Sequence, residues 1–352
     1  MEKLDDFITM FTQKIDELSK SKSGKLFHNL LHSLLKRKSF AKDQDLWTRL
    51  YLQSLSFYPD KIGKIPATFV TKHNEILPFY MRHPFDATIL RFDTHSDLND
   101  IQDSAKLPSF YEKYRDTNDP KYIEKAQKLV WDIGASKSGV LMTTGIKDVI
   151  WGMPSWVPDK QIEIRYFIKK NKRNMKLNTQ SAISDIDFTY TKNGSEDERT
   201  YMKIQTGKLT EKGYEKIQRL LTDKYVLDID LDYFVCNGKK FEKSYFTTPS
   251  DLKSQFRTFY VDFNQEWPRN KLLMSDELIA YEKKLMKEIK EINERIRDFL
   301  RLISSLKKDG YVPCLISVCD SSNVNLVSNG YVPMNLALYV HTKVVDGLET
   351  IL

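Results

Sequence analysis

Two short apolar runs in this chain each lead directly into alternating residues that can bind metal ions. Residues 89–92 precede the sequence DTHSD at 93–97, and residues 225–227 precede the sequence DIDLD at 228–232. Side chains at positions i, i+2 and i+4 of an extended segment share one face, so each run directs three ligands toward one point. Together the two runs predict a metal centre at the ends of two strands.

The charges of these runs favour the same interpretation. Three carboxylates side by side repel one another, and their pKa values rise unless a cation lies among them. Carboxylate and imidazole ligands without thiolates suit Mn²⁺, with Fe²⁺, Co²⁺ or Zn²⁺ as competitors. A different interpretation places Asp228, Asp230 and Asp232 in a solvated strand edge, with His95 making an ordinary hydrogen bond. The presence of both runs in one chain favours the metal centre.

Length, charge and cysteine content restrict the class of protein. The 352 residues are enough for one large α/β domain with an appendage, or for two ordinary domains. The net charge of +7 is a modest basic excess that does not require nucleic acid. Cys236, Cys314 and Cys319 lack CxxC spacing, which argues against a disulfide framework and a thiolate zinc site. The first six residues, MEKLDD, are acidic and do not resemble a signal peptide, and no run approaches the ~18 apolar residues of a membrane span. We therefore expect a cytoplasmic protein without a membrane or nucleic-acid partner.

The pattern of apolar residues divides the chain near residue 58. Residues 1–58 show helical spacing, which predicts an N-terminal helical segment, and residues 59–352 comprise the predicted α/β catalytic domain. There, apolar runs alternate with helical patterns, which indicates a mainly parallel sheet with helices on both faces. The polar residues 170–206 predict a hairpin or loop excursion from the sheet, and residues 275–308 predict a long amphipathic helix. The predicted strands are 67–70, 88–92, 148–151, 162–168, 225–230 and 313–318.

A further ligand candidate, His73, follows the predicted strand at 67–70. His73 precedes Asp93 by 20 positions, which is enough chain for a strand end, a helix and the next strand. Both side chains then return to the carboxyl edge of the sheet, where sites form in such folds. The order His, then Asp-x-His-x-Asp, then Asp-x-Asp resembles the arginase or ureohydrolase superfamily, in which six such residues hold two manganese ions.

The resemblance implies a three-layer α/β/α arginase-like fold and two Mn²⁺ ions per chain, with other divalent metals possible. It makes His73 a terminal ligand of one ion and His95 the terminal ligand of the other. Asp93 and Asp97 become the carboxylate ligands of the first run.

The second run allows two registers against the family pattern. In the first, Asp230 and Asp232 bind metal, and Asp228 stands where a serine is usual. A register two residues earlier selects Asp228 and Asp230. We take the first register, which assigns Asp228 to substrate binding.

Three further segments narrow the resemblance. Residues 227–234, 149–154 and 329–333 are similar to an arginase-like branch that includes peptide arginases, which convert arginine in ribosomally made peptides to ornithine. A free-arginine enzyme usually carries a Thr/Ser-rich loop and a histidine proton shuttle after its Asp-x-His-x-Asp. This chain has Asn99 at the first loop position and neither feature. The difference argues against free arginine and favours arginine within a peptide or protein.

The predicted reaction is hydrolysis of a linear amidine at a C–N bond, which releases urea. Two divalent ions about 3.5–4 Å apart can lower the pKa of a shared water and hold the hydroxide against a guanidinium carbon. By resemblance, Asp97 also orients the hydroxide. Asp320, at the end of the apolar run 315–319, is a candidate to offer a carboxylate to the guanidinium. Asp320 is explained as well by a helix N-cap or a loop Asx-turn. His83 and His341 are the remaining candidates for a proton shuttle.

The sequence also suggests substrate-binding residues and leaves two alternative functions open. Asn99, Asp228, Trp151 and Tyr331 are the predicted substrate-binding residues, although large aromatic residues beside prolines also pack loops. One alternative is a related deacetylase, which uses a single zinc ion with an Asp-x-His pair and one later Asp. Another is a non-enzymatic protein whose basic helical N-terminus binds nucleic acid or an acidic partner.

Overall fold

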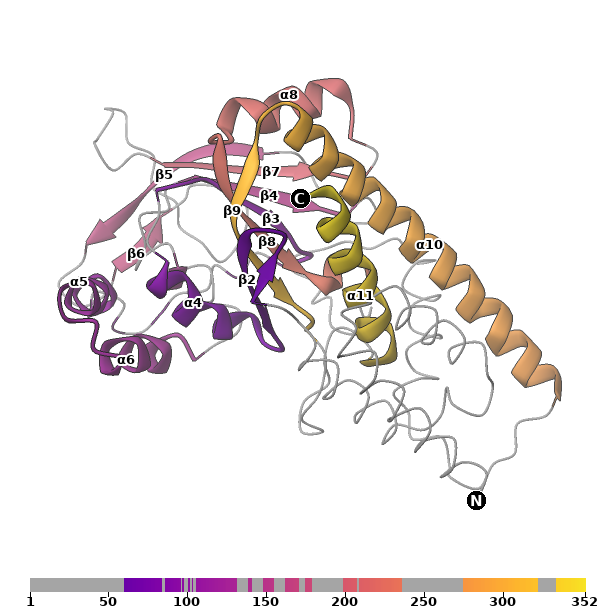
Figure 1. The fold of residues 1–352 in the computed structure, drawn as a ribbon, viewed down its shortest axis with the longest axis horizontal. Helices are drawn as coiled ribbons and strands as arrows, with labels where there is room; N and C mark the ends of the chain where they lie inside the picture. The colour runs from indigo at the N-terminus through magenta and orange to yellow at the C-terminus, as the bar shows by residue number, and fades with distance from the viewer. Residues whose placement is uncertain are drawn as a thin grey trace, which may run out of the picture.

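A nine-stranded sheet organises the part of the chain that the structure, a computed structural model, describes (Figure 1). The described residues are 60–83, 86–95, 97, 101, 103, 106–131, 139–140, 148–154, 162–170, 175–178, 199–207, 209–235, 275–321 and 334–352. The predicted helical segment 1–58 and the predicted site residues Asn99 and Tyr331 lie outside them. From one edge to the other, the strands are β1 (Lys61–Ile62), β2 (Ile65–Val70), β9 (Val312–Cys319), β8 (Lys224–Asp230), β3 (Ile89–Phe92), β4 (Val149–Met153), β7 (Arg199–Gln205), β5 (Ile162–Lys170) and β6 (Met175–Asn178).

The six inner strands of this sheet, from β2 to β7 in spatial order, all pair in parallel. β1, β5 and β6 pair antiparallel at the two edges. A parallel strand is covered on both faces, which explains why residues 225–227 of β8 are apolar without interruption. The predicted α/β class with a mainly parallel sheet is confirmed.

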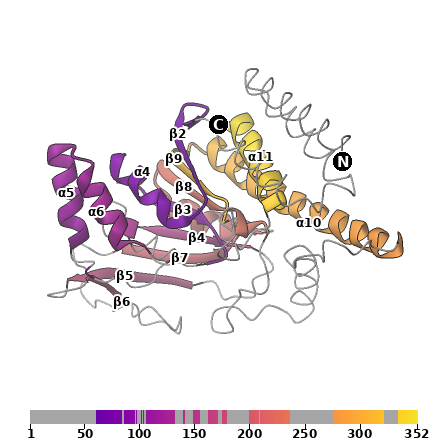
Figure 2. The same cartoon turned by 90° about the horizontal axis from the view of Figure 1, so that it is seen from below.

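Helices cover both faces of the sheet (Figures 1 and 2). Along β8, Val226 packs in the core on one face, whereas Leu227 and Ile229 pack in the core on the other. Asp228 and Asp230 therefore share the face of Val226, because side chains alternate along a strand. That face carries α4 (Leu77–Arg82), α5 (Leu107–Thr117) and α6 (Lys121–Leu129), and the opposite face carries α8 (Glu211–Leu220), α10 (Ser275–Lys308) and α11 (Met334–Ile351).

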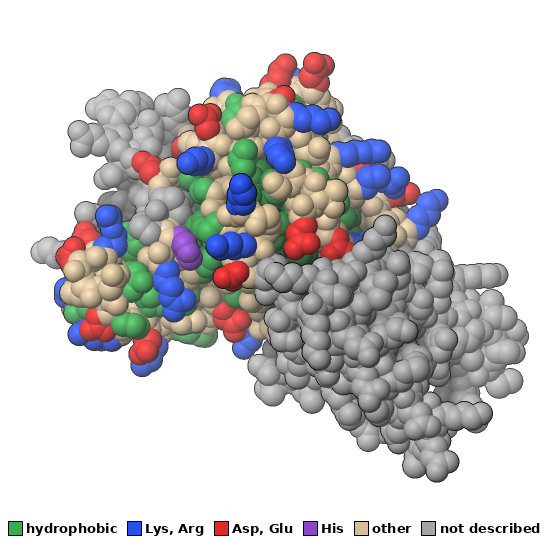
Figure 3. Space-filling view, viewed as in Figure 1, with side chains coloured by type: hydrophobic (Ala, Val, Ile, Leu, Met, Phe, Trp, Pro, Cys, Tyr) green, Lys and Arg blue, Asp and Glu red, His purple; other side chains and the backbone are tan. Residues whose placement is uncertain are grey.

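The helix α10 confirms the long helix predicted at 275–308. Ile292, Ile296, Phe299 and Ile303 are buried at helical spacing and form one stripe of the core. None of the helices in the described ranges combines the length and the apolar character that a membrane crossing needs. On the face that Figure 3 presents, basic and acidic side chains are interspersed.

The sequence predicts an excursion from the sheet over 170–206, and this is wrong for residues 199–205. These residues form β7, which lies within the sheet between β4 and β5. Polar composition hides this strand from the sequence pattern, because Arg199, Thr200, Lys203 and Gln205 occupy four of its seven positions. β5 and β6 pair antiparallel from Phe167 to Asn178, and residues 179–198 of the predicted excursion lie outside the described residues.

Replacing Phe299 should destabilise the fold strongly. Its ring is 1% exposed and makes edge contacts with Phe92 and Phe234, at centroid distances of 4.8 Å and 5.5 Å. The truncation Phe299→Ala removes these contacts and leaves a cavity, so the free energy of unfolding should fall by about 3–5 kcal/mol. Urea denaturation monitored by circular dichroism measures the change. Arg301→Ala, at an exposed position on the same helix, should change stability by less than about 0.5 kcal/mol.

Candidate metal centre

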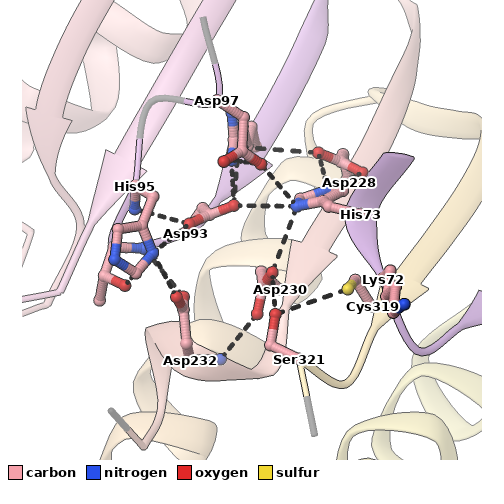
Figure 4. Close-up of polar contacts among 12 residues, drawn as sticks. Lys72, His73, Asp93, His95, Asp97, Asp228, Asp230, Asp232, Cys319 and Ser321 are labelled. Carbon is pink, nitrogen blue, oxygen red and sulfur yellow. Dashed lines mark hydrogen bonds and ion pairs between the residues drawn. The ribbon is translucent and has the colours of Figure 1, made fainter. Parts of the chain in front are cut away.

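The six predicted metal ligands meet at the carboxyl edge of the sheet (Figure 4). Three neighbouring parts of the sheet place them there, because β2, β3 and β8 all end at this edge. His73 begins the short helix η1 (His73–Ile76) three residues after β2 ends, and Asp232 lies in η4 (Leu231–Tyr233) directly after β8. The six residues are His73, Asp93, His95, Asp97, Asp230 and Asp232.

His73 directs one ring nitrogen at three carboxylates. Its Nδ1 lies 2.9 Å from Asp97 Oδ2, 3.2 Å from Asp93 Oδ2 and 3.2 Å from Asp230 Oδ2. One nitrogen carries at most one hydrogen, so it cannot donate to three oxygens at full strength. Asp97 reaches the cluster from a left-handed backbone conformation with φ of 49°, which aspartate adopts more readily than most residues. This convergence of one imidazole and three carboxylates has the donor set of a divalent metal site.

A second group of ligands lies on the other side of Asp93. His95 Nδ1 is 2.6 Å from Asp232 Oδ2 and 3.7 Å from Asp93 Oδ1. Asp232 is itself held by the backbone N–H of Thr94, which donates to Oδ1 at 3.0 Å. Asp93 thus faces His73 with one oxygen and His95 with the other, and so belongs to both groups. Ligand atoms within 4.8 Å of one another occur in the groups His73, Asp93 and Asp97; Asp93, His95 and Asp232; and His73, Asp230 and Cys319.

The centre concentrates negative charge in a buried place. Arg91 is a buried cation in contact with this group, and five aspartates around it and the two histidines are at most 7% exposed: Asp93, Asp97, Asp228, Asp230 and Asp232. Burial, followed by the charge of Asp93, raises the pKa of Asp230, as expected where carboxylates crowd without a metal. The described residues therefore form buried His/Asp clusters that could hold metal ions.

Asp228 lies behind His73 rather than among the converging ligands. Both of its oxygens are 3.2 Å from His73 Nε2, the nitrogen opposite the one that faces the other aspartates. Tyr80 donates to Asp228 at 3.4 Å, and Ser317 donates to it as well. A carboxylate on the second nitrogen of a metal-binding histidine fixes the ring and raises its basicity. The geometry favours Asp230 and Asp232 as ligands and places Asp228, predicted to bind substrate, in a supporting position.

Trp151 lies in the core beneath the centre. It is 3% exposed, and its Nε1 donates to the backbone carbonyl of Asp93 at 2.8 Å. The ammonium of Lys203 lies 4.9 Å from the centroid of the indole ring, and burial lowers the pKa of Lys203 to about 8. Trp151, predicted to bind substrate, lies in the core and holds the backbone of a candidate ligand residue.

Three other predicted residues occupy buried or partly buried positions. Asp320 follows β9, is fully buried, and donates its backbone N–H to the Val70 carbonyl at 3.0 Å. His341 stacks on Phe69 in the core, where burial lowers its pKa to about 3, so it stays neutral near pH 7 and is a poor proton shuttle. His83 Nδ1 lies 2.9 Å from the Phe79 carbonyl, one turn back in its own helix.

Several residues at the centre were not predicted from the sequence. Arg91 contacts Asp93 and Asp97, and Ser321 donates to Asp230 at 2.6 Å. Arg91 lies on β3 two positions before Asp93, which directly follows the strand, so the i, i+2 spacing also predicts that Arg91 shares the face of Asp93. Ser321 and Cys319 carry no comparable signal, because only the pairing of β9 with β8 brings them close.

Comparisons with known proteins do not extend this picture. No protein-family model matches the chain, and a search of curated proteins finds no match. The chemical interpretation therefore depends on the geometry of the residues themselves.

Metal binding should strengthen as pH rises. Burial lowers the pKa of His95, but the charges of Asp232 and Asp93 outweigh burial and raise this pKa to about 9. Burial and the charge of Asp230 raise the pKa of Asp232 to about 7. Both groups thus hold protons that an incoming ion must displace. Mn²⁺ affinity should rise between about pH 6 and about pH 9, with proton release, in calorimetric titrations using buffers of different ionisation enthalpy. A pH-independent affinity would contradict this assignment.

Neutralising Asp228 should weaken metal binding without removing a ligand. Asp228→Asn keeps the size of the side chain but takes away the charge behind His73 Nε2. Loss of such a supporting carboxylate typically costs about 10- to 100-fold in metal affinity. Equilibrium dialysis of Mn²⁺ against the folded variant measures the loss. Asp309→Asn, an exposed aspartate bonded to Tyr214 and Gln218, serves as the control and should bind metal normally.

Proposed function

We propose that the chain is a binuclear-metal hydrolase of guanidino groups, acting on arginine within a peptide or protein to yield ornithine and urea. The observation that carries the proposal is the pair of ligand groups that share Asp93, one through His73 and the other through His95. Asp93, His73 and Asp97 would hold one ion and Asp93, His95 and Asp232 the other, and two such ions would together activate a water for hydrolysis. The arginase-like arrangement of the sheet is part of the same proposal.

Manganese is the proposed ion, with two per chain. Carboxylate oxygens and imidazole nitrogens make up both groups, and this donor set suits Mn²⁺ better than softer ions. When bound, two divalent ions would lower the pKa of a shared water and stabilise the charge that develops during its attack.

The protein's residues account for the remaining steps. The attacking water adds its oxygen to the guanidinium carbon, the bond from that carbon to the side-chain nitrogen breaks, and that nitrogen takes a proton and leaves as the ornithine amine. Asp97 is suited to orient the water: although burial opposes it, Arg91 keeps its pKa low, so Asp97 stays an acceptor. Asp320 remains the proposed partner of the substrate guanidinium.

Among the six candidate ligands, His95 has the most exposed side chain. Its side chain is 24% exposed, whereas the side chains of Asp93, His73 and Asp232 are each at most 1% exposed. A peptide substrate would extend its arginine side chain past His95 and leave its backbone outside. Such an approach fits the absence of the Thr/Ser-rich loop that grips free arginine.

A single-zinc deacetylase is the second candidate. The group of Asp93, His95 and Asp232 alone supplies the three ligands of such an enzyme. His73, Asp97 and Asp230 also converge, but a single-zinc enzyme would not use them as a second ligand group. Their presence favours the binuclear reaction. The number of ions per folded chain separates the two.

Urea release tests the proposal directly. The Mn²⁺-loaded full chain should hold two ions and release urea from an arginine-containing peptide faster than from free arginine, measured by a colorimetric urea assay and mass spectrometry. Asp232→Asn should lower the rate about 100-fold or more, because it removes a ligand, and Asp309→Asn should not. A folded chain with two ions and no urea release from any peptide would refute the reaction. One ion with release of acetate from acetylated amines would favour the deacetylase.

A further inference from the structure

Arg91 is a permanent cation built into one side of the centre. It lies on β3, is 1% exposed, and extends toward the same face as Asp93. Its Nε donates to Asp93 Oδ2 at 3.1 Å, and its Nη2 donates both to that oxygen and to Asp97 Oδ2, the latter at 2.7 Å. Its Nε is also 3.8 Å from Asp228 Oδ2. Arginine does not deprotonate in proteins, so this charge is present in every state of the site.

The Arg91 guanidinium donates to the same carboxylate oxygens of Asp93 and Asp97 that face His73. Asp93 Oδ2 and Asp97 Oδ2 lie within 3.2 Å of His73 Nδ1, so an ion bound there would share both oxygens with Arg91. The other oxygen of Asp93 accepts the backbone N–H of His95 at 2.6 Å and faces the group formed with Asp232. The two metal positions therefore differ in their distance from a fixed positive charge.

We propose that Arg91 acts as an internal counter-ion that makes the two metal positions unequal. The ion at Asp93, His95 and Asp232 binds first and tightly. The ion at His73, Asp93 and Asp97 binds second and more weakly, because the guanidinium repels it and withholds part of the charge of its ligands. The inference rests on the proposed binuclear centre and assigns it a stable state with one ion. Activity would then follow the supply of the second ion.

Metal titration of the full chain tests the inference without an activity assay. Mn²⁺ is added to the metal-free protein, and free Mn²⁺ is followed by electron paramagnetic resonance. The wild-type chain should show two steps that differ in affinity by about tenfold or more, as expected for a fixed like charge beside one position. Arg91→Met should tighten the second step by about 10- to 100-fold and leave the first nearly unchanged. Arg91→Lys, which keeps the charge, should retain a weak second step.

Two controls keep the test decisive. Lys203→Met removes another buried cation from the same face of the sheet. The Lys203 ammonium lies over Trp151 and not against Asp93 or Asp97. This variant should therefore leave the difference in affinity between the two steps unchanged. If Arg91→Met does not fold, the order of loading still answers the question in variants that retain Arg91: His95→Ala should lose the tight step, and His73→Ala the weak one.

The outcomes separate this inference from the proposed function. Equal affinities in the wild type, a second step that Arg91→Met weakens or leaves unchanged, or the reverse assignment of the two histidine variants would overturn the role of Arg91. The binuclear centre and its urea release would stand in each of these cases. A wild-type chain that binds no metal would overturn both.

Discussion

The concentration of buried negative charge at one edge of the sheet is the constraint on which the rest of this structure depends. Five carboxylates with little access to water cannot all ionise at low cost unless cations lie among them. Arg91 supplies one positive charge, and the histidines face the remaining oxygens from two sides. The fold thus holds together groups that repel each other, and this is typical of a place built to receive ions.

A row of residues beneath the ligands explains how the fold holds them. The register of the sheet sets Ser317, Asp228, Arg91, Trp151 and Lys203 side by side across five neighbouring strands. Each of the middle three contacts a ligand residue: Asp228 contacts His73, Arg91 contacts Asp97, and Trp151 contacts the backbone of Asp93. Supporting groups of this kind fix the orientation of the ligands they touch. Placing them on strands rather than loops makes the geometry of the centre rigid.

The sequence predicts the parts of this centre that depend on local spacing. The ligand types at 93–97 and 228–232, each directly after an apolar run, and the position of His73 after a strand predict that the six candidate ligands meet at one edge. The predicted extended geometry holds only in part, because residues 93–97 follow the end of β3, Asp97 is left-handed and Asp232 lies in η4. The supporting contacts depend on which strands are neighbours, and spacing along the chain does not reveal this. Ser317 reaches Asp228 only because β9 lies beside β8, and the strand β7 is hidden by its polar residues. Local pattern therefore predicts the ligands, and topology decides what holds them.

The strict alternation of β8 also protects the protein from misfolding. A shift of this strand by one residue would turn Asp228 and Asp230 toward the core beneath α10 and present Leu227 and Ile229 to the ligands of the neighbouring strand. Such a shift would bury two carboxylates in the apolar core and remove two apolar side chains from it. Both changes cost free energy. The charges of Asp228 and Asp230 thereby help to specify the register of β8 during folding, and removing them makes the shifted pairing less unfavourable.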